Sequence, residues 1–507
     1  MSVINSNISA LKAQASSTQN ARKLDTAMER LSTGLRINSA KDDAAGLAIS
    51  TKMTAQINGL NQAIRNANDG LSMVNTIEGS LTQTTNVLQR MRELAVQSAN
   101  DSNSVEDRQF IQAEMVQMQS ELDRISGQSR YNGTKVLDGS FTNKQVQIGA
   151  GAGETIAFNV DSASSSDIGV YQTRQGQIGT VAAASTLPTS TVTASTLTVT
   201  GFLGDEDVVV AQDASAYDVA SSINDEYANT GVLATAVTKA KIDSLSGTGT
   251  ITFDVSGKNS TDQAVTVSAT LADTDDLTDL AAAFNLATAT TGITATLSSD
   301  KKSVLLGSAD GYNIGLADFT HTTTSGTINV MGMEGDATAD DAGLTTTANG
   351  YEAAITLTDS GSDSTLVTGD ILFESTKAFT VDSSTGTNSV TAFVGTTAVA
   401  ASLQAVSDVD ASTTAGAAQA IRVLDGAIAK ISTMRSDLGS IASRLEKTVD
   451  SLTAASTNTA ASRSRIMDTD YSTETTALSR AQIIAQASTA MLAQANQSSS
   501  MVMKLLQ

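Results

Sequence analysis

The sequence contains no cysteine, no tryptophan, one histidine (His321) and one proline (Pro188). Disulfide bonds, thiol nucleophiles, histidine-based catalytic triads and most zinc or haem sites need residue types that are absent here or present only once. These absences do not exclude carboxylate chemistry. Because the pattern of the whole chain favours a structural protein, we expect no catalytic residues, no metal ligands, no cofactor and no enzymatic activity. Aromatic residues make up 3% of the chain, so its core must be built from Ala, Leu, Ile, Val and Met, which suits narrow helical seams.

Long apolar runs are also missing. The opening residues, MSVINSNISALKAQ, lack the basic segment and apolar run of a cleavable secretion signal. No stretch approaches the length of a membrane span, so we expect no membrane insertion.

Positive charge is scarce in the middle of the chain. Residues 176–400 hold 6 Lys and no Arg against 27 Asp and Glu, whereas residues 1–175 hold 16 basic against 17 acidic residues and residues 401–507 hold 9 against 9. The nearly neutral ends can pack against copies of themselves, and the acidic middle is expected to stay solvated. No basic cluster suited to phosphates stands out, so nucleic acid is not expected as a partner.

Apolar residues recur at spacings of three and four along the first 126 residues. After a polar stretch at 32–48, such a stripe predicts one long helix over about 57–98. Ser104 and Asp107 then form a start that resembles a capping box, and Gly127 is expected to end the helix that follows. The simplest arrangement is two antiparallel helices.

Turn and strand signals follow these helices. The sequence YNGT at 131–134 predicts a tight turn, and KQVQIG and ETIAFNV predict a small β-hairpin. Residues 176–400 contain runs such as STLTVTG, GTITFDV, AVTVSATL and KSVLLG, which favour folded Thr-rich sheets over the alternative of low-complexity disorder.

The central region also contains an internal similarity at an offset of 61 residues. Residues 218–234 align with residues 279–295, and each copy reads as a short helix, a glycine turn and a strand. The matched positions fall on one helical face and one turn, which favours a duplication over coincidence.

A second long apolar stripe runs from Ile421 to Leu452, and a poorer one follows from about residue 472. Because two distant parts of the chain each offer one narrow apolar face, they should pack on each other. The predicted fold is α+β and multidomain: a long antiparallel helical bundle or coiled coil from the N- and C-terminal segments, with a β-rich central insertion.

The two end segments are short of large apolar residues, yet the chain closes with MVMKLLQ. A lone helix pair of this kind is marginal against chain entropy. We predict that residues 1 to about 40 and about 465 to 507 are disordered in the free subunit and become helical when many copies bury them together. An antiparallel coiled coil complete in one chain is the alternative. The predicted polymerisation seam consists of Ile4, Ile8, Leu11, Leu24, Met28, Leu31, Ile484, Met491, Val502, Leu505 and Leu506.

Several stretches of the sequence resemble the conserved motifs of one known family. The stretches INSNISALKAQ, RLSTGLRINSAKDDAAGLAIS, NDGLSMVNTIEGSL, LQRMRELAVQSAN, SRIMDTDYSTET and AQIIAQASTAMLAQANQ closely resemble bacterial flagellin, in the right order, across roughly the first 170 and last 100 residues. The resemblance implies five segments: an inner-tube helix at 1–44, rod helices and a hairpin at 45–175, a variable outer region at 176–400, a rod helix at 401–455 and an inner-tube helix at 456–507.

The resemblance also implies partners and a location. Members of this family form a helical homopolymer, the extracellular flagellar filament, after unfolded export through the flagellar type III apparatus. An export chaperone holds their C-terminal helices, and cap and hook-associated proteins meet the filament.

One exposed stripe is singled out on LQRMRELAVQSAN. Arg90, Leu94 and Gln97 lie at i, i+4 and i+7, beside the seam positions. A solvated helix face with one stray Leu is the plain interpretation. In similar flagellins the matching Arg and Leu, with a Glu that corresponds to Glu114, form the surface bound by the animal Toll-like flagellin receptor. We expect these residues to contact that receptor and an adjacent subunit.

Two other functions remain open at this stage. A surface adhesin would use the Thr-rich repeats to bind a ligand, with the helices as a stalk. A hook-filament junction protein would share the terminal pattern.

Overall fold

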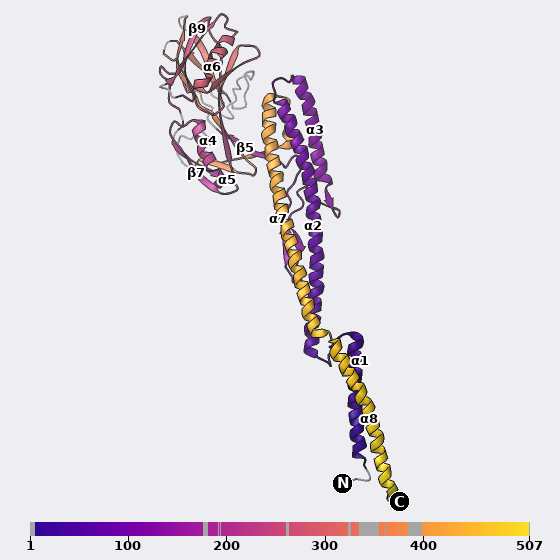
Figure 1. Ribbon diagram of the computed structural model, residues 1–507. Helices are drawn as coiled ribbons and strands as arrows, with labels where there is room; N and C mark the ends of the chain where they lie inside the picture. Colours follow the sequence, from indigo (N-terminus) through magenta and orange to yellow (C-terminus); the bar gives the residue numbers. More distant parts are fainter. Residues whose placement is uncertain are drawn as a thin grey trace. The chain divides into compact units, whose positions relative to one another are not determined.

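The computed structural model describes residues 6–175, 181–190, 192, 194–259, 263–322, 326–333, 354–359, 361–383 and 398–505 (Figure 1). The chain divides into two compact units. Unit 1 comprises Met1–Thr76, Thr142–Asn159 and Leu438–Gln507, and unit 2 comprises Ile77–Phe141 and Val160–Asp437. Helices α2 (Ala44–Ser98) and α7 (Thr414–Met467) each contribute to both units.

Unit 1 is mainly helical. It contains α1 (Ile8–Thr33), the first part of α2, the last part of α7, α8 (Tyr471–Leu505) and a hairpin of β3 (Lys144–Gln147) and β4 (Thr155–Phe158). The hairpin that the sequence predicts is confirmed, and Asn66 of α2 donates a side-chain hydrogen bond to its Gln147 carbonyl oxygen at 3.1 Å. A Cβ added at Gly70 of α2 would touch Val146 and Leu445, so hairpin, α2 and α7 meet closely there.

The long helices extend beyond their predicted ends. Helix α2 begins at Ala44 instead of near residue 57, because the Asp43 carboxylate accepts a hydrogen bond from the Gly46 amide at 2.8 Å and satisfies a first-turn donor. Helix α7 continues to Met467, past the last predicted stripe residue, Leu452. Large apolar residues become rare before the helix ends. The helix continues because Ala favours helix without burying much surface.

The helical part of unit 2 is held by α2, α7 and α3 (Val105–Gln128). Their fully buried apolar side chains include Ile77, Leu81, Leu88, Met91, Met115, Leu122, Leu424 and Ile431. Ion pairs join α2 to α7, among them Arg92 to Asp425 at 2.6 Å and Arg435 to Glu78 at 2.7 Å. The predicted capping box of α3 is confirmed, whereas the helix ends at Gln128 and not at Gly127.

The central region contains several antiparallel sheets, which confirms the predicted fold class. One sheet has the order β10-β9-β13-β16, a second β11-β12-β8-β17-β5-β20 with β14 and β15 attached through β8, and a third β19-β18-β6-β7. Outside these sheets, β1 and β2 flank the predicted tight turn at Asn132 and Gly133. The bounds are β1 Arg130–Tyr131, β2 Thr134–Lys135, β5 Gly169–Gln175, β6 Ser195–Thr200, β7 Asp205–Val210, β8 Leu233–Asp243, β9 Gly249–Ser256, β10 Val265–Leu271, β11 Ile293–Leu297, β12 Ser303–Ser308, β13 Ile314–His321, β14 Thr327–Met333, β15 Ile355–Thr358, β16 Thr365–Val367, β17 Asp370–Ser375, β18 Thr380–Ser383, β19 Val399–Ala400 and β20 Ser402–Ala405.

In the described part of the central region, three short helices accompany the sheets: α4 (Ala216–Asp225), α5 (Tyr227–Thr230) and α6 (Thr278–Thr291). Helix α6 contributes to one apolar core, where the rings of Phe253, Phe284 and Phe319 lie in contact. Helix α4 contributes Val219 and Ile223 to the other core. Each of the two helices thus has an apolar core of its own.

The same local structure recurs at the positions matched by the internal similarity. The side-chain amide of Asn224 donates to the carbonyl oxygen of Ala234 and its side-chain oxygen accepts from the Ala234 amide, both at 2.8 Å. Asn285 makes the same pair of bonds to Ala295, at 2.9 and 2.8 Å. In each copy one asparagine therefore ties the helix to the strand that follows it. A duplication as the origin of this pattern stays a prediction.

Within unit 2, α7 approaches the sheet strands β5 and β17. A Cβ added at Gly426 of α7 would lie 2.7 Å from Val170 Cβ, so only glycine permits this crossing. Arg422 of α7 forms an ion pair with Glu374 at 3.4 Å, and Gln172 donates a hydrogen bond to the same carboxylate. Burial raises the pKa of Glu374, and the positive charge of Arg422 opposes that shift.

Candidate functional site

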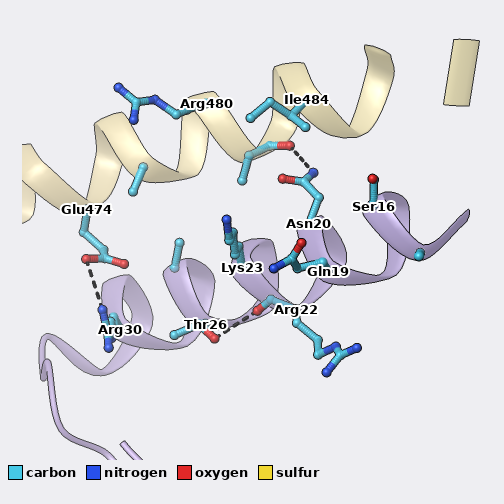
Figure 2. Close-up of a pocket in the computed structure, with 14 residues that line it drawn as sticks. Ser16, Gln19, Asn20, Arg22, Lys23, Thr26, Arg30, Glu474, Arg480 and Ile484 are labelled. Carbon is cyan, nitrogen blue, oxygen red and sulfur yellow. Dashed lines mark hydrogen bonds and ion pairs between the residues drawn. The ribbon is translucent and has the colours of Figure 1, made fainter. Parts of the chain in front are cut away.

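The first candidate surface is the α1–α8 pair of unit 1, and it is joined by polar contacts. Asn20 donates a hydrogen bond to the Ala481 carbonyl oxygen at 2.7 Å, and Asn7 donates one to the Ala495 carbonyl oxygen at 3.0 Å. Figure 2 shows Asn20 reaching from α1 to α8. Each of these bonds joins one particular residue of α1 to one particular residue of α8. The bonds therefore fix the register of the two helices, where large apolar side chains are few.

An open groove of about 780 Å³ runs between the two helices. Its lining comprises Ala15, Ser16, Gln19, Asn20, Arg22, Lys23, Thr26, Ala27, Arg30, Glu474, Ala477, Arg480, Ala481 and Ile484. Arg30 and Glu474 approach to 3.9 Å at one end, and Arg22 points away from α8 (Figure 2). The lining is mostly small or polar, so the pair itself buries little apolar surface.

The predicted seam residues are largely uncovered within the chain. Ile8 is 51% exposed, Leu11 64%, Met28 49%, Ile484 44% and Met491 64%. Leu24 and Leu31 are half-buried. Val502 and Leu505 belong to α8, but their side chains lie outside what the structure describes, as do residues Ile4 and Leu506 altogether.

Sequence reasoning did not identify what joins the two helices. The seam prediction selected large apolar residues, whereas the buried positions of the pair include Asn20, Ala27 and Ala481. Both end segments are helical in the structure. Their predicted disorder in the free subunit concerns the protein in solution and stays a prediction.

The second candidate surface lies on α2 and α3 in unit 2. Arg90 forms ion pairs with Glu93 and Glu114, each at 3.0 Å, so the predicted Arg90 and Glu114 lie together at the surface. Hydrogen bonds to Glu93 and then Glu114 raise the pKa of Arg90. Gln97 is exposed, and its backbone carbonyl oxygen accepts a hydrogen bond from Asn103.

Leu94 does not lie exposed beside Arg90 within the chain, and its predicted contact with a receptor or an adjacent subunit stays a prediction. Leu94 is 2% exposed and belongs to the core of the helical part of unit 2. The stripe of Arg90, Leu94 and Gln97 was predicted from a single helix. Helix α3, whose Glu114 reaches Arg90, lies against α2 at this point, which the periodicity of α2 alone does not show.

The surface instead presents a residue that the sequence analysis did not select. Phe110 of α3 is 75% exposed, whereas its neighbour Ile111 is buried. A signal existed in the sequence, because Phe110 falls out of phase with the apolar stripe of Ile111, Met115, Met118, Leu122 and Ile125.

The described residues contain no group of three or more His, Cys, Asp or Glu side chains placed to hold a metal ion. Among these residues, too, no helix combines the length and apolar character that crossing a membrane requires.

Comparisons with known proteins cover nearly the whole chain. Residues 4–142 match a family model described as the bacterial flagellin N-terminal helical region, and residues 421–506 match one described as the C-terminal helical region. A B-type flagellin of Pseudomonas aeruginosa is 40% identical over 505 residues, with 99% of both chains covered. A flagellin of Salmonella typhimurium is 35% identical over 520 residues, again with 99% of both chains covered.

The solved structures share a lower sequence identity with this chain. FliC from Burkholderia pseudomallei is 20% identical, with a TM-score of 0.29 over 74% of this chain and 99% of that one. The flagellar junction protein FlgL from Legionella pneumophila is 14% identical, with a TM-score of 0.32 over 83% of this chain and 99% of that one. At these TM-scores neither likeness bears on the fold.

Proposed function

The chain belongs to the bacterial flagellin family, and we propose that its α1–α8 pair is the surface through which copies of this structural subunit join in the extracellular flagellar filament. Relatives named flagellin align along 99% of the chain, which favours this function over a junction protein or an adhesin.

The observation that carries the proposal is the contrast in burial between two helix pairs. Along α2 and α7, large apolar residues such as Leu88, Met91 and Ile431 are fully buried. Along α1 and α8, Leu11, Ile483 and Met491 are each more than half exposed. Apolar surface of this extent on two neighbouring helices is costly in water and is removed when other copies cover it.

Seeded polymerisation of the purified full-length chain tests the proposal. The intact chain should enter the pellet after addition of filament seeds, and removal of about 40 residues from either end should abolish this, because each truncation deletes one helix of the pair. A chain that stays in solution with seeds, or truncated chains that still polymerise, would contradict the proposal.

The same exposed residues bear on how the chain reaches the filament before it assembles. We infer that the chain is exported unfolded and that a chaperone covers α8 beforehand, since Ile483, Ile484 and Met491 would otherwise promote aggregation. Binding of the chaperone to the full chain, and loss of binding when residues 471–505 are deleted, is the expected result. Contacts with the cap and hook-associated proteins belong to the same proposal.

For the animal Toll-like receptor, we propose a contact surface that centres on the exposed residues Arg90, Gln97 and Glu114. The predicted contact of Leu94, which is 2% exposed, stays a prediction. Changing Arg90 and Glu114 to Ala should lower receptor signalling while the helical content of the chain is unchanged. Full signalling by that double variant would exclude this surface.

A further inference from the structure

Two exposed helix faces in the described part of the chain carry the same pattern with opposite charge. On α3, Phe110 is 75% exposed and lies in line with Glu106 and Ala113, at i−4 and i+3. Both neighbours are exposed as well. Along the helix, this face presents an acidic residue (Glu106), then a large apolar residue (Phe110), then a small residue (Ala113).

The second face lies at the start of α2. Ile49 is 49% exposed and lies in line with Ala45 and Lys52, at i−4 and i+3, and both are exposed. Along the helix, this face presents a small residue (Ala45), then a large apolar residue (Ile49), then a basic residue (Lys52). When two such helices pack antiparallel, Glu106 meets Lys52, Phe110 meets Ile49 and Ala113 meets Ala45.

The charges at the two faces are available for a partner. Among the described residues neither Glu106 nor Lys52 makes an ion pair. The acidic residues that precede α2 are engaged locally: the Asp42 carboxylate accepts hydrogen bonds from the amides of Asn38 and Ser39, and Asp43 accepts one from Gly46.

We propose that the Glu106–Phe110–Ala113 face of one subunit packs antiparallel on the Ala45–Ile49–Lys52 face of a second copy. The inference rests on the proposed function, because an open helical polymer needs two different surfaces that fit each other, and a single self-complementary surface closes into a dimer. It adds a contact that is separate from the α1–α8 pair.

The net charges of the two units also favour a second copy of the chain as the partner. Unit 1, which carries Ile49, holds 15 Lys and Arg against 11 Asp and Glu, a net charge of +4. Unit 2, which carries Phe110, holds 16 against 42, a net charge of −26. Of the unit 2 charge, −21 lies in residues 176–400 and −5 in the remaining part, which carries Phe110. Unit 1 of one copy and this part of unit 2 of another therefore have opposite net charges and attract each other, whereas two copies of unit 2 repel.

Cross-linking tests the contact directly, because the chain has no cysteine of its own. A full-length variant with Phe110→Cys and Ile49→Cys should form a ladder of disulfide-linked chains when its seeded polymers are mildly oxidised, and none as free subunits. The matched control is Phe110→Cys with Leu286→Cys, since Leu286 of α6 is also highly exposed and lies outside the proposed contact. No ladder from the first pair in polymers, or an equal ladder from the control, would overturn the inference.

Charge reversal gives an independent readout. Glu106→Lys and Lys52→Glu should each raise the critical concentration for seeded polymerisation by about tenfold, and the two changes combined in one chain should restore it. Asp225→Lys, at an exposed site on α4, should have no effect. If wild-type chains fail to polymerise, the proposed function is wrong. If they polymerise and the single reversals behave like Asp225→Lys, this contact alone is wrong.

Discussion

Asn20 of α1 and Ala481 of α8, 461 residues apart in the sequence, are joined by a hydrogen bond of 2.7 Å from the Asn20 side-chain amide to the Ala481 carbonyl oxygen. Asn20 is 5% exposed, so losing this bond leaves a largely buried carbonyl oxygen with one partner fewer. The pairing of the two end helices therefore depends on a polar residue as much as on apolar ones.

Changing Asn20 to Ala should weaken the α1–α8 pair by about 1–2 kcal/mol, because a buried hydrogen bond disappears. Seeded polymerisation should then need a critical concentration roughly 5- to 30-fold higher. The control is Thr18→Ala, whose exposed hydroxyl bonds only within α1, to the Gln14 carbonyl oxygen. Equal critical concentrations for the two variants would show that the bond has no role in assembly.

Leu94 and Arg90 should differ sharply in their effect on folding. Leu94 is 2% exposed, so Leu94→Ala leaves a buried cavity and should cost about 2–5 kcal/mol of unfolding free energy. Arg90→Ala removes an exposed ion pair and should cost about 1 kcal/mol or less. Thermal unfolding followed by far-UV circular dichroism compares them, and a Leu94 variant as stable as the Arg90 variant would mean that Leu94 is not buried.

Asn224 and Asn285 should be matched in importance, since each ties a helix to the strand that follows it by two hydrogen bonds. Asn224→Ala and Asn285→Ala should each destabilise its own copy by about 1–3 kcal/mol, because the backbone groups of Ala234 or Ala295 lose their partners. Amide exchange should rise around β8 for the first variant and around β11 for the second. A uniform rise in both regions for either variant would argue against two separate clamps.

Glu374 should give unit 2 a measurable pH dependence. Its pKa in the folded chain is raised above the ordinary value of 4.5 by burial. A raised pKa favours folding below that ordinary value, and this contribution is lost as the pH rises through the folded-state pKa. Glu374→Gln cannot ionise, so the stability difference, wild type minus variant, should fall as the pH rises from 4 through that range. A difference that is flat with pH, or that grows, would contradict the assignment.

The sequence predicted those features that depend on local residues. The capping box at Ser104 and Asp107, the tight turn at Asn132 and Gly133 and the β3–β4 hairpin follow from side chains close in sequence, and the structure confirms them. The resemblance in the terminal motifs likewise led to the family that the comparisons show.

The features that the sequence did not reveal depend on distant partners. Leu94 is buried on a face of α2 that lies outside its main apolar stripe, which the periodicity of α2 alone does not show. The Asn20 bond to Ala481 likewise depends on which helices meet. The candidate surfaces stay predictions, while the burial of Leu94 and the exposure of Phe110 are seen only in the structure.

Amide hydrogen exchange of α1 and α8, measured on the same full-length chain as free subunit and as filament, tests the central claim most directly. If other copies cover the exposed faces of Leu11, Ile483 and Met491, amides in residues 8–33 and 471–505 should exchange quickly in the subunit and become strongly protected in the filament. Strong and equal protection of both helices in the two states would contradict the account.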